Sequence, residues 1–229
     1  MQRYDYTTSP IPQTMYRSEL LRAVKQGSER AVHAFLKRQP RPLCVAFARG
    51  WNKIVPLSEF CFGRDFRADF LIISAHSGAW HACFVELESP AARLYIRDGS
   101  ESKVMKVALR QVKDWNIWLQ QNGPQFRREL RDNLERAAES DPRIALDPTN
   151  LSGDRLLDPR TRIVNRFAVV IGRRDTLRPE DKVKRDHEDA AEIATYDRLL
   201  DIAARDAVGG REIRKARRDY AQKAGPKVP

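Results

Sequence analysis

The chain has 229 residues, a formal net charge of +11 at pH 7 and a pI of about 9.9. Because 41% of the residues are hydrophobic, the chain can form a buried core, which argues against wholesale disorder. No apolar run reaches the roughly 20 residues of a membrane helix, and segment 1–12 lacks a signal-peptide core. The basic excess favours a polyanionic partner, either a nucleic acid or an anionic membrane surface.

The cysteines are odd in number, widely spaced and set among hydrophobic residues; they are Cys44, Cys61 and Cys83. They form no CxxC pair of the kind that binds zinc. The pattern predicts reduced thiols in the core of a cytoplasmic protein.

The N-terminal third begins with an expected irregular arm over residues 1–15. Apolar residues then recur at helical spacing, which predicts a helix over 16–38 with Gly27 as its weak point. Two prolines shortly after Arg38 end this helix. Residues 54–62 fit either a short helix or a strand.

Two strand-like runs, 66–74 and 80–88, form the most informative part of the sequence. The first carries Asp69, and the second carries Glu86 and Glu88 near its end. Since side chains at positions i and i+2 of a strand share a face, Glu86 and Glu88 are expected to point the same way.

Three carboxylates at the ends of buried strands repel one another, which costs free energy unless a cation neutralises them. Hard divalent cations prefer oxygen ligands. We therefore predict that Asp69, Glu86 and Glu88 bind a divalent metal ion. Taken alone, Asp69 also fits a strand-end acid with an ordinary hydrogen-bond partner.

The middle of the chain is predicted to be helical. Residues 100–121 carry a broad apolar stripe, and Ser100 or Ser102 can cap this helix. A second, charge-rich helix is expected over 124–139. Residues 140–160 collect Asp, Pro, Ser, Gly and Asn, which predicts a long surface loop.

The last third alternates short strands and helices. The pattern predicts strands over 167–171 and 193–195, and helices over 180–191 and 196–207. The segment from Arg205 onward is strongly basic.

The order of elements predicts an α/β domain over 16–204, with a mixed sheet covered on both sides. One further strand is expected, in either 54–62 or 90–97. Segment 205–229 forms a basic tail.

The ordered motifs resemble those of the PD-(D/E)xK nuclease superfamily and, more narrowly, the Shedu family of bacterial anti-phage nucleases. The resemblance covers residues 19–201 and rests mainly on Glu-x-Glu-x-Pro at 86–90 followed by Gln-x-x-x-Trp at 111–115. The full set of matching segments, which includes these two motifs, comes in the family's order: 59–63, 68–72, 84–90, 108–115, 169–173 and 195–200.

The resemblance implies a restriction-endonuclease-like fold and a DNA endonuclease that requires Mg²⁺ or Mn²⁺. It implies metal binding by Asp69 and Glu86, and it aligns Gln111 with a helix glutamine that lines the site. Glu59 matches an acidic position upstream of the strand pair. The family also suggests self-association into a homo-oligomer. The partner expected is DNA and not a membrane.

Glu88 stands where the family usually has a catalytic lysine. A lysine there would orient the attacking water and stabilise charge on the phosphate, which glutamate cannot do. Some restriction endonucleases use Glu-x-Glu, and their second carboxylate acts as general base or helps to hold the metal. Lys103 is a candidate substitute, because it lies about 80° from Gln111 around the predicted helix.

Nucleic-acid contacts are expected from Arg64 and Arg67. Arg173 and Arg174 fit either DNA contact or plain surface placement. The alternative function is a nucleic-acid-binding or regulatory module of the same fold with little hydrolytic activity. A third alternative is an RNA-cleaving toxin.

Overall fold

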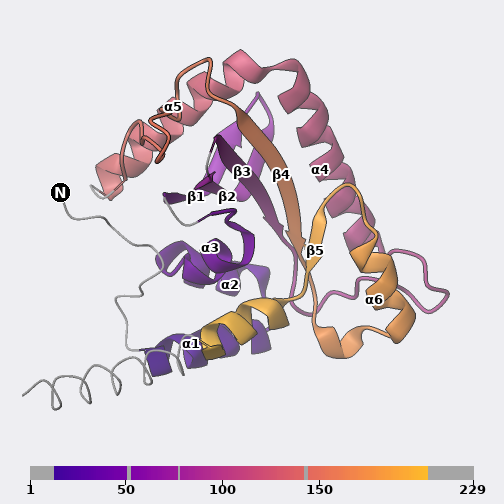
Figure 1. Cartoon of the computed structure of the whole chain (residues 1–229). Helices are drawn as coiled ribbons and strands as arrows, with labels where there is room; N and C mark the ends of the chain where they lie inside the picture. Colours follow the sequence, from indigo (N-terminus) through magenta and orange to yellow (C-terminus); the bar gives the residue numbers. More distant parts are fainter. Residues whose placement is uncertain (1–12, 51–52, 77, 142–143, 206–229) are drawn as a thin grey trace, which may run out of the picture.

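A five-stranded sheet lies between two layers of helices in the computed structural model, which describes residues 13–50, 53–76, 78–141 and 144–205 (Figure 1). The strands follow one another across the sheet in the order β1-β2-β3-β4-β5. Strands β1, β2 and β3 are antiparallel, whereas β4 and β5 run parallel to β3. The predicted α/β class and mixed sheet are confirmed.

The strands are β1 (Ile54–Phe62), β2 (Phe66–His76), β3 (Ala79–Leu87), β4 (Ile163–Val170) and β5 (Glu192–Ala194). The helices are α1 (Gln13–Lys25), α2 (Glu29–Arg38), α3 (Arg41–Phe47), α4 (Lys103–Gln121), α5 (Gly123–Ser140) and α6 (Pro179–Asp186). A 3-10 turn, η1 (Arg174–Thr176), precedes α6, and residues 196–205 form a further helix.

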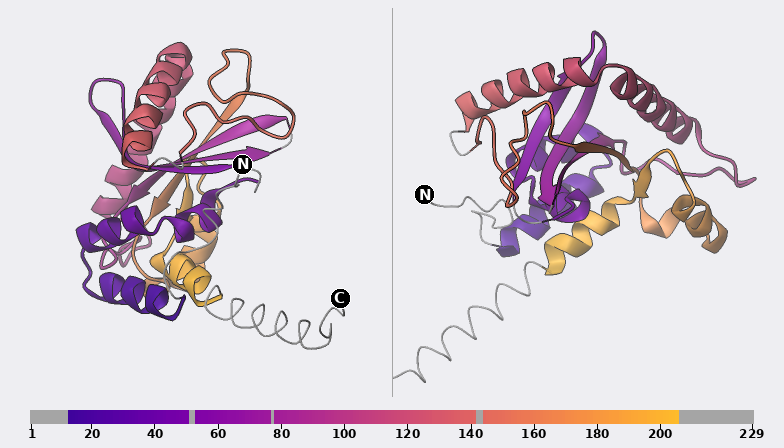
Figure 2. Two further views of the ribbon diagram at one scale, coloured as in Figure 1. Left: turned by 90° about the vertical axis from the view of Figure 1, so that its left-hand side faces the viewer. Right: turned by 45° about the horizontal axis from the view of Figure 1, so that its top comes forward.

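Helices cover both faces of the sheet (Figures 1 and 2), and each face has its own core. The α4-side core lies under α4 and α5 and is rich in aromatic rings, including Phe62, Phe84 and Trp115. The α2-side core lies under α1, α2, α3 and the helix at 196–205. Strands β2 and β3 are buried on both faces, which is why they read as continuous apolar runs.

The predicted helix over 16–38 is wrong as a single element. The chain breaks at Gly27, whose φ of 67° favours glycine, and Ser28 caps α2 by accepting a hydrogen bond from the Ala31 N–H. Helix α1 begins at Gln13, inside the predicted arm. Helix α3 was not predicted; it accommodates Pro42 in its first turn, where no intrahelical N–H is needed.

Other boundaries also differ from the predictions. Residues 54–62 form strand β1, whereas 90–97 holds only an isolated bridge between Tyr95 and Glu101. Strand β4 begins earlier than expected because Ile163 already pairs with Trp80 of β3. Helix α6 ends before residue 191, and Ser102 rather than Ser100 caps α4.

The three cysteines are free, but only Cys44 and Cys83 are buried. The core prediction is wrong for Cys61, which is exposed because Phe60 and Phe62 on either side occupy the buried face of β1. The described helices include none with the length and apolarity to cross a membrane. Segments 1–12 and 206–229, which hold most of the predicted arm and tail, lie outside the described residues.

Gly172 connects the end of β4 to the segments around it. Its N–H donates to the Ser89 carbonyl, and its own carbonyl accepts from the Tyr196 N–H. Its φ is 61°, and a Cβ at this position would lie 2.3 Å from the Ala92 carbonyl oxygen. Gly172 therefore holds the chain after β3 against the start of the helix at 196–205.

We predict that Gly172→Ala lowers the free energy of unfolding by about 2–4 kcal/mol, because it adds a backbone clash to an unfavourable φ. The matched control is Gly153→Ala, where φ is 87° but no described atom lies within 4 Å of the new Cβ. In the same urea titration the control should lower the free energy of unfolding by about 1 kcal/mol. Equal losses in the two variants would contradict the close approach at Gly172.

Candidate active site

Strands β2 and β3 separate at Asp69. Their ladder ends with the pair Phe70 and Val85, so the next row brings Asp69 opposite Glu86. The Asp69 carboxylate continues the ladder, because its Oδ2 accepts a hydrogen bond from the Leu87 N–H at 2.8 Å. This bond fixes one carboxylate beside the backbone that carries the second.

The same row continues onto β1, where Glu59 lies opposite Asp69 between the pairs Ser58–Phe70 and Phe60–Ala68. Glu59 has a φ of 53°, which marks a local distortion of β1. Its carboxylate is paired with Lys37 of α2, and the hydrogen bond from Lys37 lowers the pKa of Glu59. Asp69, Glu86 and Glu59 thus form one acidic row across the strands, in which Lys37 already balances the charge of Glu59.

Glu86 is the most perturbed carboxyl of the row. Its Oε1 accepts a hydrogen bond from Nε2 of Gln111 on α4 at 2.8 Å. Its Oε2 is buried and has no hydrogen-bond partner among the described residues. Burial, followed by repulsion from Asp69 and Glu88, raises the pKa of Glu86 to about 9. A free carboxylate oxygen therefore lies in a place where negative charge is unfavourable.

Glu88 follows the end of β3. Its N–H donates to the Val170 carbonyl at 2.8 Å, and its carbonyl accepts from the Tyr196 hydroxyl at 2.7 Å. Burial, with repulsion from Glu29 and Asp69, raises the pKa of Glu88 to about 7.

A cleft of about 740 Å³ opens between the β1–β2 turn and α4. Its lining includes Asp69, Glu86 and Gln111, which the sequence predicted as site residues, but not Glu88. The cationic side chains of its lining are Arg64, Arg67 and Arg110. Glu86 and Glu88 were expected to point the same way, but only Glu86 lines this cleft.

Helix α2 contributes two residues that the sequence did not single out. Glu29, the first residue of α2, lines the cleft, and burial together with Asp69 raises its pKa. His33 lies one turn later, with Nε2 3.8 Å from Oδ1 of Asp69. No motif marks these positions, because α2 reaches the site only through tertiary packing.

The other predicted site residues lie elsewhere. Lys103 is exposed at the start of α4 and does not line the cleft, so it does not supply the missing lysine in this arrangement. Arg173 binds Asp197 with Nη2 2.8 Å from Oδ1, and Arg174 binds Asp201 at 2.6 Å. Both arginines therefore carry intramolecular counterions, and their contact with DNA stays a prediction.

The donor set fits a hard divalent cation held by two carboxylates. Asp69 and Glu86 share a row, and the unpartnered Oε2 of Glu86 is available to a cation. In the described part of the chain no three His, Cys, Asp or Glu side chains are grouped closely enough to hold a metal ion, so the expected trio is not assembled. Magnesium is commonly bound by one or two carboxylates, with water and substrate phosphate as its other ligands.

The family model described as Shedu protein SduA, C-terminal, matches residues 26–200. This range contains every residue of the cleft, from Glu29 to Trp115. No curated protein matches the chain.

The raised pKa values predict a pH-dependent stability in chelating buffer. Above about pH 5 the folded protein retains protons that the unfolded chain releases, on Glu88 up to about pH 7 and on Glu86 up to about pH 9, so the free energy of unfolding falls as pH rises. The free energy of unfolding of Glu86→Gln should therefore exceed that of the wild type by about 1–3 kcal/mol at pH 8. The difference should shrink towards pH 5, as followed by thermal unfolding.

Glu59→Gln is the matched control and has the opposite sign. The pKa of Glu59 is lowered, so its carboxylate stabilises the fold above its usual pKa, and this contribution is lost as pH falls. The variant should be slightly less stable than the wild type at pH 8 and equal to it in acid. The same pH response in both variants would contradict the assigned environments.

Proposed function

The chain belongs to the family of the C-terminal region of the Shedu protein SduA, and from this premise we propose that it is a metal-dependent DNA endonuclease with a PD-(D/E)xK core. Family membership itself implies a role in anti-phage defence. The nuclease proposal rests on the site where β2 and β3 separate. There Asp69 and Glu86 lie opposite each other, and Oε2 of Glu86 is buried without a hydrogen-bond partner among the described residues.

In this proposal Asp69 and Glu86 hold a Mg²⁺ or Mn²⁺ ion. The bound ion supplies a Lewis acid and lowers the pKa of a water molecule. Gln111 donates a hydrogen bond to Oε1 of Glu86. This bond orients the carboxylate and leaves Oε2 for the cation. A cation held there would offset the burial that raises the pKa values of both carboxyls and the repulsion from Asp69 that raises the pKa of Glu86 further.

The arginines of the cleft are suited to hold the DNA. Arg64 and Arg67 extend from the β1–β2 turn and β2, and Arg110 extends from α4 beside Gln111. A guanidinium presents a planar set of donors that matches phosphate oxygens, so these side chains would bind the strand and offset its charge.

Glu88 is the proposed proton acceptor. A pKa near 7 suits a general base at neutral pH, and the hydrogen bonds to the Val170 carbonyl and from the Tyr196 hydroxyl hold its backbone at the edge of the site. Its carboxyl lies among Glu29 and Asp69 rather than in the lining of the cleft, so it would act through water on the reacting centre.

The second candidate function is a binding module of this fold with little hydrolytic activity. It is favoured by one observation, that no lysine is part of the lining of the cleft in the described structure. Such a module would retain DNA through the same arginines.

We predict that Asp69→Asn abolishes Mg²⁺-dependent nicking of supercoiled plasmid, because it removes one of the two carboxylates that hold the ion. The matched control is Asp65→Asn, which makes the same charge change at another residue of the cleft and should keep its activity. DNA retention without cleavage by the wild type, under Mg²⁺ and Mn²⁺ alike, would favour the binding module. Cleavage of RNA alone in the same assay would favour the toxin.

The role of Glu88 is tested separately. We predict that Glu88→Gln slows nicking by about 10²–10⁴-fold, the usual contribution of a general base. Glu88→Lys, which restores the residue usual in the family, should recover part of the rate. Wild-type rates in Glu88→Gln would assign proton transfer to another group.

A further inference from the structure

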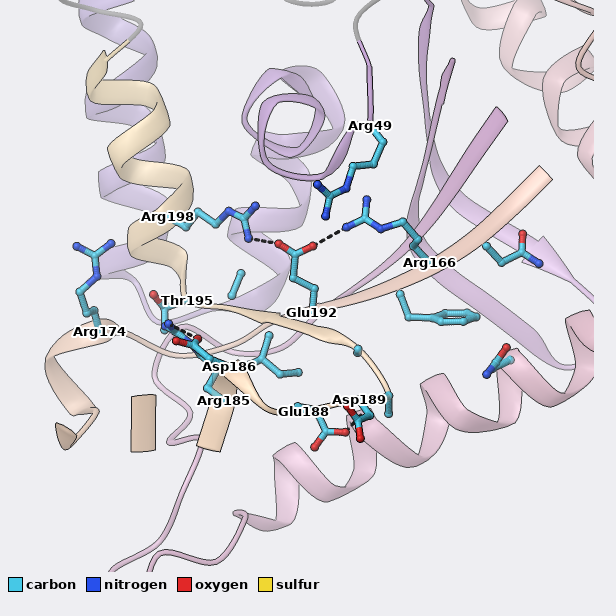
Figure 3. Close-up of a pocket in the computed structure, with 17 residues that line it drawn as sticks. Arg49, Arg166, Arg174, Arg185, Asp186, Glu188, Asp189, Glu192, Thr195 and Arg198 are labelled. Atoms are coloured by element: carbon cyan, nitrogen blue, oxygen red, sulfur yellow. Dashed lines mark hydrogen bonds and ion pairs between the residues drawn. The ribbon is translucent and has the colours of Figure 1, made fainter. Parts of the chain in front are cut away.

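A second cleft, of about 900 Å³, lies at the β5 edge of the sheet (Figure 3). It shares no lining residue with the cleft of Asp69 and Glu86. Strand β5 pairs only with residues 168–170 of β4, so the earlier part of β4 borders this cleft with no described strand on that side. Nothing in the proposed hydrolysis uses this part of the molecule.

Three guanidinium groups surround one carboxylate in this cleft. Arg166 lies 2.7 Å from Oε2 of Glu192, and Arg198 is bonded to Oε1 of the same residue. The guanidinium of Arg49 points into the same space (Figure 3) but forms no hydrogen bond or ion pair with a described residue. One carboxylate therefore faces three positive charges.

The guanidiniums of Arg166 and Arg198 are fixed in place. Arg166 donates through Nη1 to the Phe47 carbonyl at 3.0 Å, and Arg198 donates through Nη2 to the Ala46 carbonyl at 2.6 Å. Each guanidinium uses two of its five N–H donors in the described hydrogen bonds, so donors remain for another acceptor. An anion would find charge and geometry already arranged, which lowers the entropic cost of binding.

The other wall of the cleft is acidic and comprises Asp186, Glu188 and Asp189 (Figure 3). Arg185 on this wall is already paired with Asp186 at 2.8 Å. The acidic wall repels anions, so negative charge is favoured only at the arginine end.

We propose that Arg49, Arg166 and Arg198 form a binding site for a phosphate group, carried either by a free nucleotide or by a nucleic-acid strand. The planar donor array of arginine matches phosphate oxygens, and the excess of positive charge matches a dianion. The Glu192 carboxylate is bonded to the guanidiniums of Arg166 and Arg198, so it competes with the phosphate for them. The site is independent of the proposed nuclease activity.

The test is calorimetry on the full chain in EDTA, with inorganic phosphate, AMP and a short single-stranded DNA without terminal phosphates as separate probes. Arg49→Gln should weaken binding about 10-fold, as expected when a charged hydrogen-bonding partner is lost. It should leave the melting temperature unchanged, because Arg49 has no side-chain partner in the described structure. Arg185→Gln, which removes a charge of the same cleft that is already paired, should bind like the wild type.

Glu192→Gln should bind phosphate more tightly than the wild type, because it removes the competing charge. Arg49-dependent binding of phosphate or AMP identifies a free phosphate compound as the ligand. Arg49-dependent binding of DNA alone identifies a strand. The proposal is overturned if no probe binds, if Arg49→Gln and Arg185→Gln bind alike, or if Glu192→Gln weakens binding. Since EDTA prevents metal-dependent cleavage, none of these results depends on the nuclease proposal.

Discussion

The hydrogen bond from the Leu87 N–H to the Asp69 carboxylate is the contact on which the proposed active site depends. It replaces a backbone pair at the point where β2 and β3 separate, and it holds a charged group beside the buried Glu86. The proximity is unfavourable without a cation, since burial raises the pKa of both carboxyls and repulsion from Asp69 raises that of Glu86 further. A fold that keeps such a pair stores free energy that a bound divalent ion releases.

The sequence predicted the parts of this arrangement that follow from strand and helix periodicity. The two apolar runs identified β2 and β3, and the apolar stripe predicted α4. The family resemblance, rather than periodicity, singled out Gln111, which bonds to Glu86. The sequence could not predict the participation of Glu29, because α2 reaches the strand ends only through packing of the α2-side core. Nor could the i, i+2 rule predict the position of Glu88, because β3 ends at Leu87 and other elements hold the next residue.

Glu88, at the position where the family resemblance predicts a lysine, adds an acidic group to the site instead of a cation. The cations that line the acid cleft are the arginines Arg64, Arg67 and Arg110, which suit phosphate binding better than proton transfer. The second cluster, Arg49, Arg166 and Arg198, lies at the β4–β5 edge of the sheet. These two groups of arginines are separate, and only the first adjoins the carboxyls of Asp69 and Glu86.

The most direct test of the central claim is an anomalous difference map from a crystal soaked in Mn²⁺. If Asp69 and Glu86 hold the ion, a peak will lie between their carboxylates, within bonding distance of Oε2 of Glu86, and a crystal of Asp69→Asn will show no peak there. A soaked wild-type crystal with ordered side chains but no peak at that position would contradict this metal site.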